Sequence, residues 1–226
     1  MPPEKARDSS SANSDSPVSS TQRVVEDLRK RIIQGQLLPG EKLKVESLKT
    51  LLDTGASPIR EALSLLTSDQ LVERIDQRGF RVAPASAAHF REILMLRCEL
   101  DVIALRKSIE AGDAQWEESV VLAHHRFAKT SRDDIDNWEI LHKDFHKTLI
   151  SACESPILLR FCEQLYDLNI RYRYLAGRSG SYAKRNIDGE HEEIMQSTIE
   201  RNVDLAVSRL ISHYTLTGDF LADQFL

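Results

Sequence analysis

The sequence lacks the features that would place a protein in a membrane, in a secretory pathway or in a disulfide-linked scaffold. No stretch approaches the roughly 20 uninterrupted apolar residues that a membrane-spanning helix requires, and no apolar signal segment is present. The three cysteines, Cys98, Cys153 and Cys162, lack the CxxC spacing of a metal site, and their odd number leaves at least one unpaired within the chain. We therefore expect a reduced, cytoplasmic protein without a membrane partner.

A net basic charge is also lacking, but the charge is unevenly divided along the chain. The formal net charge is -5, which argues against general attraction to anionic surfaces. Residues 21–84 hold 11 Lys and Arg against 9 Asp and Glu, whereas residues 85–226 hold 17 against 23, so the first block is +2 and the second -6. Because a DNA-binding protein needs only a local basic face, the acidity of the second block does not exclude DNA.

The length and composition favour two folded domains behind a disordered tail. A chain of 226 residues with 41% apolar content can bury one large core or two smaller ones. Residues 1–19 are rich in Ser, Pro, Asp and Asn with almost no large apolar side chains, which predicts disorder. At Pro84 the pattern changes from short helices and two strands to helices alone. We expect one domain over residues 20–84 and a second over residues 85–226, in a mainly α protein.

Residues 20–84 have the order of elements of a winged helix-turn-helix. Apolar residues recur at helical spacing in three segments, which are separated by turns at residues 37–40 and 54–56. The predicted helices cover residues 20–35, 45–52 and 58–68. Because a helix-turn-helix places its last helix in the major groove, this domain is expected to bind DNA.

The third predicted helix carries the candidate reader of DNA bases. Ser57 is expected to cap this helix, because its hydroxyl can accept a bond from an unpaired amide of the first turn, and Pro58 suits the first helical position. Arg60 then points away from the apolar face and can reach a guanine edge with two hydrogen bonds. In the alternative, Arg60 pairs with a carboxylate on a neighbouring helix and Ser57 serves only as a cap, without touching phosphate.

A predicted hairpin follows the third helix and forms the wing. Two strand-forming segments, residues 71–75 and 80–83, flank a turn that ends in Gly79, where a positive φ is expected. Arg78 lies at the tip and is expected to enter the minor groove or to contact phosphate. The alternative for Arg78 is a solvated turn residue.

The second domain is expected to be an antiparallel bundle of about six helices. After Pro84 the apolar spacing is helical throughout, and no internal repeat appears. Long helices with short connections pack as bundles whose core can hold a ligand or a metal ion between facing side chains. The expected helices cover residues 86–111, 114–130, 134–153, 156–176, 181–200 and 202–222.

Four histidines of this bundle form a candidate metal site. His142 and His146 lie four residues apart on a helical stretch, so both imidazoles project from one face and can bind the same ion. His191 and His213 lie on two later helices, which an antiparallel bundle can bring opposite the pair. Four nitrogens would complete a closed site and three an open one, for Zn or a similar divalent metal. The alternative for each ring is a surface or hydrogen-bonded histidine.

Basic and aromatic side chains of the bundle are candidates for binding a ligand. Arg97 borders an apolar face of the first bundle helix and therefore needs an anionic partner. That partner is either a bound ligand or Asp101, one turn further along the helix. In one interpretation Tyr172 and Arg173 border the pocket that binds this ligand, and in the other they form a solvated helix face.

The motifs described above resemble two regions of known regulators. Residues 21–84 are similar to the winged-helix domain of the GntR family of bacterial transcription regulators, above all in residues 39–41, 58–63 and 78–82. The helices that follow resemble the all-helical effector domain of the FadR-type branch, in residues 96–97, 142–146, 190–191 and His213. Together the two resemblances cover nearly the whole chain beyond the tail.

The resemblance implies a homodimer that binds an operator built as an inverted repeat, and it implies roles for particular residues. The four histidines match the family's metal ligands, and Arg97 matches an arginine that helps to hold an effector carboxylate. The first ligand is more often Asp or Asn in the family, so His142 makes the site richer in nitrogen and favours Zn or Ni. The family usually has a second arginine where this chain has Ala56, so we expect a different base preference.

Taken together, the motifs predict a transcription regulator. Residues 55–60 are most similar to those of repressors of short-dicarboxylate, glutarate-type catabolism, so we expect a repressor that a small carboxylate, bound at the metal, releases from its operator. One alternative is a metal-dependent, hydrolase-like enzyme, which the lack of a general base at motif spacing disfavours. The other is a regulator for which the metal itself is the signal.

Overall fold

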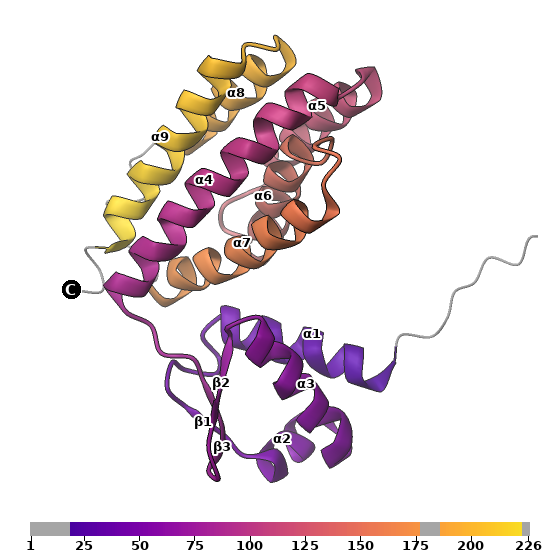
Figure 1. The fold of residues 1–226 in the computed structure, drawn as a ribbon, viewed down its shortest axis with the longest axis vertical. Helices are drawn as coiled ribbons and strands as arrows, with labels where there is room; N and C mark the ends of the chain where they lie inside the picture. Colours follow the sequence, from indigo (N-terminus) through magenta and orange to yellow (C-terminus); the bar gives the residue numbers. More distant parts are fainter. Residues whose placement is uncertain (1–18, 177–185, 223–226) are drawn as a thin grey trace, which may run out of the picture.

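The computed structural model describes residues 19–176 and 186–222, and helices dominate both ranges (Figure 1). Apart from Ser19, the predicted tail lies outside the described residues, as do residues 181–185 of one predicted helix. The described elements are, in chain order, α1 (Ser20–Ile33), β1 (Lys42–Leu43), α2 (Val45–Leu52), α3 (Ala56–Ser68), β2 (Val72–Ile75), β3 (Gly79–Val82), α4 (Ala87–Ala111), α5 (Ala114–Ala128), α6 (Ile135–Leu149), α7 (Pro156–Ala176), α8 (Ile187–Ile199) and α9 (Val203–Ala222).

The N-terminal unit consists of α1, α2, α3 and a three-stranded sheet. The helical spacing of apolar residues predicts these helices well, because the spaced residues of α3 are fully buried: Ile59, Ala62, Leu63 and Leu66. β2 and β3 pair antiparallel, which confirms the predicted wing. β1 adds a third strand beside β3, in the order β1-β3-β2, with Lys42 opposite Arg81. This unit is therefore a winged helix-turn-helix.

The start of α3 differs from the prediction. The helix begins at Ala56, two residues earlier than expected, and Gly55 precedes it in an extended conformation. No side chain caps this end, so the prediction that Ser57 is the cap is wrong. Ser57 is the second helical residue, with an exposed side chain, and Pro58 is the third. Pro58 costs no hydrogen bond there, because amides of the first turn have no partner within a helix.

The turn of the wing has the backbone that its sequence predicts. Gly79 has a φ of 90°, which confirms the expected positive angle, and Gln77 also lies in the left-handed region with a φ of 57°. The amide of Arg78 donates to the carbonyl of Ile75 over 3.0 Å and closes the turn. The side chain of Arg78 is therefore held at the exposed tip of the hairpin.

Helices α4 to α9 form the second unit, as the bundle prediction anticipates. α4 and α9 lie side by side along one side of this unit, and α5 packs against α6 and α8 (Figure 1). Its core includes Leu105, Trp116, Phe127, Phe145, Ile194 and Leu210. None of the helices in the described ranges is long and apolar enough to cross a membrane.

Helix α7 joins the two units. It lies at the base of the bundle, next to α1 (Figure 1). Leu165, Leu168 and Tyr172 of α7 pack in one apolar cluster with the buried residues of α1 and α3. Gly35, at the end of α1, has a φ of 71°, and a Cβ atom there would lie 3.4 Å from Leu175. The winged unit is thus packed against a helix of the bundle as well as connected to it by the chain.

Candidate DNA-binding face and metal centre

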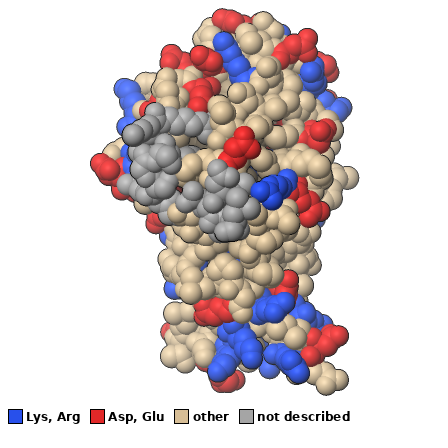
Figure 2. All heavy atoms as spheres, turned by 90° about the vertical axis from the view of Figure 1, so that its left-hand side faces the viewer, with Lys and Arg blue, Asp and Glu red and all other residues tan. Residues whose placement is uncertain are grey.

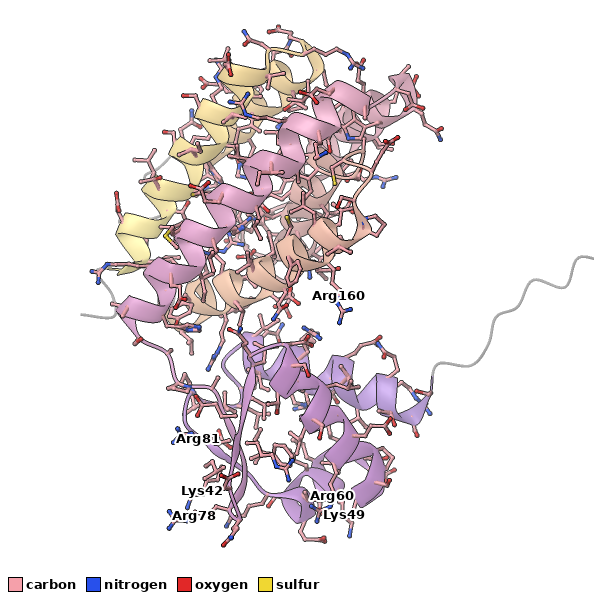
Figure 3. The ribbon with its side chains drawn as sticks, viewed as in Figure 1. Lys42, Lys49, Arg60, Arg78, Arg81 and Arg160 are labelled. Atoms are coloured by element: carbon pink, nitrogen blue, oxygen red, sulfur yellow. The ribbon has the colours of Figure 1, made fainter. Side chains whose placement is uncertain are left out.

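The end of the winged unit that points away from the bundle carries its basic side chains. Figure 3 shows five of them there, and they come from the sheet and its hairpin turn, from α2 and from α3: Lys42, Lys49, Arg60, Arg78 and Arg81. Figure 2 shows several basic side chains close together on this part of the face, with acidic ones beside them. Because phosphate contacts supply much of the affinity for DNA, this end of the unit is the candidate DNA-binding face.

Lys42, Arg60 and Arg78 are the members of this group that make no ion pair within the described ranges. Within the described residues, neither guanidinium makes an ion pair, so the alternative in which Arg60 pairs with a neighbouring carboxylate is not observed. By contrast, Arg81 pairs with Glu73 over 2.7 Å and Lys49 with Glu46 over 2.8 Å. Ser57 lies one turn before Arg60 and is also exposed. The structure therefore leaves Ser57, Arg60 and Arg78 accessible on one unit.

The four histidines meet in the core of the bundle. His142 and His146 come from α6, His191 from α8 and His213 from α9, and all four are buried. Their candidate ligand atoms all lie within 4.8 Å of one another. Nε2 of His142 lies 3.0 Å from Nε2 of His191, and Nε2 of His146 lies 3.2 Å from each of these two atoms. The nitrogens of a tetrahedral zinc site are about 3.3 Å apart, so these distances fit one bound ion.

The outer nitrogen of three rings faces an acceptor, which fixes where each ring holds its proton. Nδ1 of His191 lies 2.6 Å from the carbonyl of Ile187, and Nδ1 of His213 lies 2.8 Å from Oε2 of Glu190. Nδ1 of His146 lies 3.2 Å from the hydroxyl of Tyr214, whose own proton is donated to Asp101. Each of these rings therefore donates through Nδ1 and leaves a lone pair on Nε2. Several lone pairs that converge on one point form a candidate site for a cation.

His142 differs from the other three candidate ligands. Its Nδ1 atom lies 2.8 Å from the hydroxyl of Tyr166 and 3.1 Å from Arg173, which can only donate. When Nδ1 accepts from Arg173, Nε2 holds the ring proton and donates it to His191. When Nδ1 donates to Tyr166, Nε2 has a lone pair for a metal. The surroundings of His142 therefore provide hydrogen-bond partners for its ring both when a metal ion is bound and when it is absent.

The electrostatics of the cluster keep three of its rings neutral. Burial lowers the pKa of His142, His146 and His191 well below the ordinary histidine value, and neighbouring rings and arginines lower it further. Neutral imidazole is the form that binds a metal. The buried cluster can therefore hold a divalent ion with nitrogen ligands alone.

Arg97 lies beside this cluster and already has internal partners. Its side chain is 4% exposed, and its Nε atom is 3.3 Å from Asp101, the alternative partner that the sequence suggested. The guanidinium also donates to Tyr214 over 3.0 Å, and it lies 4.7 Å from the ring centre of Tyr166. Arg97 is thus connected through Tyr214 to the ligand His146.

Arg173 and Tyr172 do not share one environment. Arg173 reaches the cluster, where it pairs with Glu139 over 2.6 Å and contacts His142. Tyr172 does not border the cluster, so the prediction that both residues line one pocket is wrong for Tyr172. Its hydroxyl accepts from the amide of Ser86, at the junction between the units. Adjacent residues of a helix point about 100° apart, which separates the two side chains.

The sequence interpretation missed the residues that orient the ligands: Glu139, Tyr166, Glu190 and Tyr214. Three of them have a signal in their spacing, since Glu139 lies one turn before His142, and Glu190 and Tyr214 adjoin His191 and His213. Tyr166 has a weaker sequence signal: it lies two helical turns before Arg173, on the same face of the helix.

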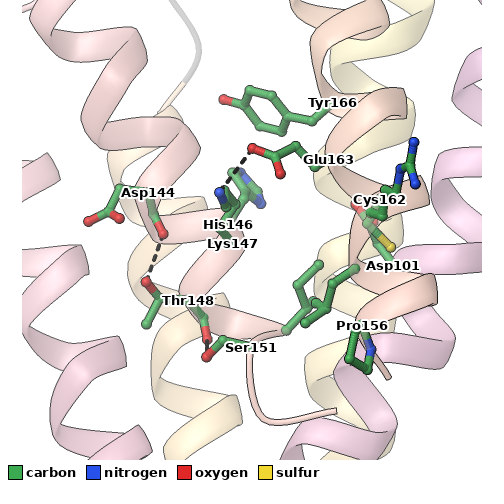
Figure 4. Close-up of a pocket in the computed structure, with 13 residues that line it drawn as sticks. Asp101, Asp144, His146, Lys147, Thr148, Ser151, Pro156, Cys162, Glu163 and Tyr166 are labelled. Atoms are coloured by element: carbon green, nitrogen blue, oxygen red, sulfur yellow. Dashed lines mark hydrogen bonds and ion pairs between the residues drawn. The ribbon is translucent and has the colours of Figure 1, made fainter. Parts of the chain in front are cut away.

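A cavity of about 520 Å³ opens between α6 and α7 next to this cluster. Its lining includes His146, Asp101 and Tyr166, and a pair of Lys147 and Glu163, 2.9 Å apart, lies at its edge (Figure 4). A volume of this size suits a small organic ligand. The cavity therefore offers a place for a ligand within reach of a histidine of the cluster.

A winged helix-turn-helix joined to a helical unit with a buried cluster of four histidines is the architecture of a DNA-binding regulator. Models of protein families match both units: one described as bacterial regulatory proteins of the gntR family matches residues 20–82, and the FCD domain matches residues 92–216. The chain belongs to the GntR family of bacterial transcription regulators and carries an FCD domain, the C-terminal domain of the FadR-type branch. It is a regulator and not an enzyme.

Relatives support this assignment. The chain is 38% identical over 193 residues to the uncharacterized HTH-type transcriptional regulator BphR of Paraburkholderia xenovorans (strain LB400), covering 82% of this chain and 78% of BphR. It is 31% identical over 171 residues to the HTH-type transcriptional repressor GlaR of Escherichia coli (strain K12), covering 74% and 78%. The solved structure of E. coli McbR/YncC has the same fold, with a TM-score of 0.78 at 20% identity over 92% of this chain and 100% of that one.

Proposed function

We propose that this regulator is a homodimeric repressor that a small carboxylate releases from its operator, and that the carboxylate binds at a metal ion held by His142, His146, His191 and His213. The convergence of the ligand nitrogens carries this proposal, because buried lone pairs about 3 Å apart repel one another without a cation. In this proposal residues 20–84 bind DNA, and residues 85–226 bind the effector and form the dimer.

Zn or Ni suits the cluster best. Four imidazoles and no carboxylate are a nitrogen-rich set, which Mg and Mn do not favour. Four nitrogens close a tetrahedral site, whereas an effector needs a further position. Ni, or Zn with an expanded shell, can accept an effector oxygen in addition to the histidines.

Two arginines beside the cluster can bind an anion. Arg97 is linked to the cluster through the hydroxyl of Tyr214, and Arg173 contacts His142 directly. We propose that both arginines bind the effector carboxylate, and that Arg97 gives up its bond to Asp101 when it does so. The ligand class follows the resemblance to short-dicarboxylate, glutarate-type repressors. Release requires that the effector binds the DNA-competent arrangement less tightly than the other one.

The DNA-binding face is proposed to read one half-site per subunit. Arg60 reads a base edge in the major groove, and Ser57 contacts a phosphate beside it. Arg78 and Gly79 form the wing tip, where the lack of a side chain at Gly79 allows close approach to the backbone of DNA. Two subunits then require an inverted repeat.

Metal titration followed by ligand screening tests this proposal. Full-length protein is treated with a chelator and titrated with Zn or Ni, and we expect one ion per chain. The loaded protein is then heated with small mono-, di- and hydroxy-carboxylates. A ligand at 100 times its Kd adds about 2.7 kcal/mol to the free energy of unfolding, so at least one acid should raise the melting temperature.

A matched pair of variants makes this test specific. His191→Ala removes a buried ligand, whereas His125→Ala removes an exposed histidine of α5. We expect the first variant to lose both the metal and the response to the acid, and the second to keep both. Stoichiometric metal binding with no response to any acid would instead support the second candidate, a regulator that senses the metal itself, which the closed set of four nitrogens favours.

A further inference from the structure

A row of ion pairs crosses the junction between the winged unit and the bundle. Arg29 of α1 pairs with Asp69, the residue that ends α3, and its other amino group lies 3.3 Å from Oδ2 of Asp167 on α7. The second oxygen of Asp167 lies 2.5 Å from the ammonium group of Lys143 on α6. The row therefore runs from the DNA-reading helix to the helix that carries His142 and His146.

Each end of the row lies next to a functional element. Asp69 is the C-terminal cap of α3, the helix that carries Arg60, so the position of Asp69 follows the position of that helix. Lys143 follows His142 directly in the chain, and its ammonium group lies 5.6 Å from the ring centre of Tyr166. The hydroxyl of Tyr166 in turn contacts Nδ1 of His142.

The centre of the row is shielded from solvent. Asp167 is 5% exposed, and each of its two oxygens has a cationic partner. Arg29 is only partly exposed as well. Charges in such surroundings are screened less by salt than surface pairs, and removal of one partner leaves the other buried and uncompensated. A shift of α6 therefore changes the energy of the contacts that Arg29 makes.

Other polar contacts at the junction stay further from the histidines. Gln164 of α7 donates to the carbonyl of Ser68 over 3.4 Å, and Gln34 of α1 donates to Asp136 in the first turn of α6 over 3.0 Å. These bonds, and the one that the buried guanidinium of Arg171 on α7 donates to the carbonyl of Ala83, do not involve the turn of α6 that holds His142. The row through Asp167 is thus the polar connection best placed to report on the metal site.

We propose that Arg29 and Asp167 are positioning residues that couple the metal site to the DNA-reading helix, so that occupation of the histidine cluster shifts α3 through Lys143, Asp167, Arg29 and Asp69. This inference rests on the proposed function, because it requires that the four histidines bind a metal. It adds the route by which the signal leaves the bundle.

Hydrogen exchange of the full-length protein, with and without Zn, tests the coupling. Asp167→Asn keeps the shape of the side chain but removes the charge that Arg29 and Lys143 share. The matched control is Asp27→Asn, because Asp27 pairs with Arg31 over 2.7 Å within α1 and crosses no junction. Hydrogen exchange is followed in two groups of helices: α1 and α3 in the winged unit, and α6, α8 and α9 in the bundle. Arg29→Gln repeats the test from the other side should Asp167→Asn fail to fold.

In the wild type and in Asp27→Asn, we expect Zn to slow exchange in both groups of helices. The change in α1 and α3 should reach about 5-fold, the lower end of usual coupling strengths. In Asp167→Asn, Zn should still slow exchange in α6, α8 and α9 but no longer in α1 and α3. An equal response of α3 in all three proteins would overturn the coupling role, as would a wild type in which α6 responds and α3 does not. A wild type in which Zn protects no helix would overturn the proposed metal function together with this inference.

Discussion

The hydroxyl of Tyr214 lies 3.2 Å from Nδ1 of His146 and fixes the tautomer of that ring. Tyr214 donates its own proton to Asp101 over 2.7 Å and accepts from Arg97 over 3.0 Å, so toward His146 it can only accept. The ring must therefore hold its proton on Nδ1 and present a lone pair on Nε2. One hydroxyl thus connects the proposed effector arginine to a proposed metal ligand.

Tyr214→Phe should weaken metal binding without removing any ligand. His146 loses the acceptor that orients it, and loss of such an outer partner typically costs 10- to 100-fold in metal affinity. We expect a drop in this range for Zn, measured by competition with a chelator. Tyr172→Phe is the control, because it removes a buried tyrosine hydroxyl at the junction, away from the histidines. Equal losses in the two variants would show that Tyr214 has no specific role at the site.

The metal-free protein should lose stability as the pH falls below about 6.5. The pKa of His142, His146 and His191 is lowered in the folded protein, so above the ordinary value of about 6.5 the rings are neutral whether the chain is folded or unfolded. Below it, the unfolded chain takes up protons that the folded cluster resists. The free energy of unfolding should fall by up to about 1.4 kcal/mol per pH unit for each ring.

Urea unfolding at several pH values between 7.5 and 5.5 measures this slope. His146→Gln removes one buried ring and should flatten the dependence, whereas His125→Gln removes an exposed ring and should leave it unchanged. A slope that is the same in both variants and in the wild type would mean that the cluster does not control the acid sensitivity.

Arg60→Ala should abolish the preference for the operator. A bidentate contact with a base provides about 1 to 3 kcal/mol of discrimination, so we expect a loss of roughly 5- to 150-fold for a duplex selected by the wild type from random DNA. Binding of an unrelated duplex should change little. Fluorescence anisotropy measures both, with Arg106→Ala on α4 as a control that loses only a surface pair with Asp204. Unchanged selectivity would remove Arg60 from the base-reading residues.

Ala56→Arg should change which operator is preferred. Ala56 is the first residue of α3, in the same turn as Ser57, and the resemblance to the GntR family implies an arginine at this position. A second arginine at this end adds a base or phosphate contact, and a phosphate contact should steepen the salt dependence by about one unit. Selection from random DNA with both proteins gives the two consensus sequences. Identical consensus sequences and salt slopes would show that position 56 does not face DNA.

Much of the fold follows from local patterns in the sequence. The bounds of α2 and the burial of Ile59 and Leu66 follow from helical spacing, and the positive φ of Gly79 follows from a turn that only a few residue types favour. β1 does not follow, because a strand of two residues has no pattern of its own and exists through its pairing with β3. The start of α3 was missed because Ser57 and Gly55 are both acceptable caps, and tertiary packing decides between them.

The meeting of the four histidines was predictable from the sequence, but the surroundings of the cluster were not. Four-residue spacing places His142 and His146 on one face, and antiparallel packing brings His191 and His213 toward them. The contact of Tyr214 with His146, and the separation of Tyr172 from Arg173, depend on the rotation of each helix about its axis. A sequence interpretation with boundaries uncertain by several residues does not determine that rotation.

The most direct test of the central claim is the affinity of one protein preparation for its selected operator in three states: metal-free, loaded with Zn or Ni, and loaded in the presence of small carboxylates. The account predicts that at least one carboxylate weakens operator binding about 10-fold or more in the loaded protein, and has no effect on the metal-free protein or on His191→Ala. Operator binding that stays the same with every acid, although each chain holds a metal ion, would contradict it.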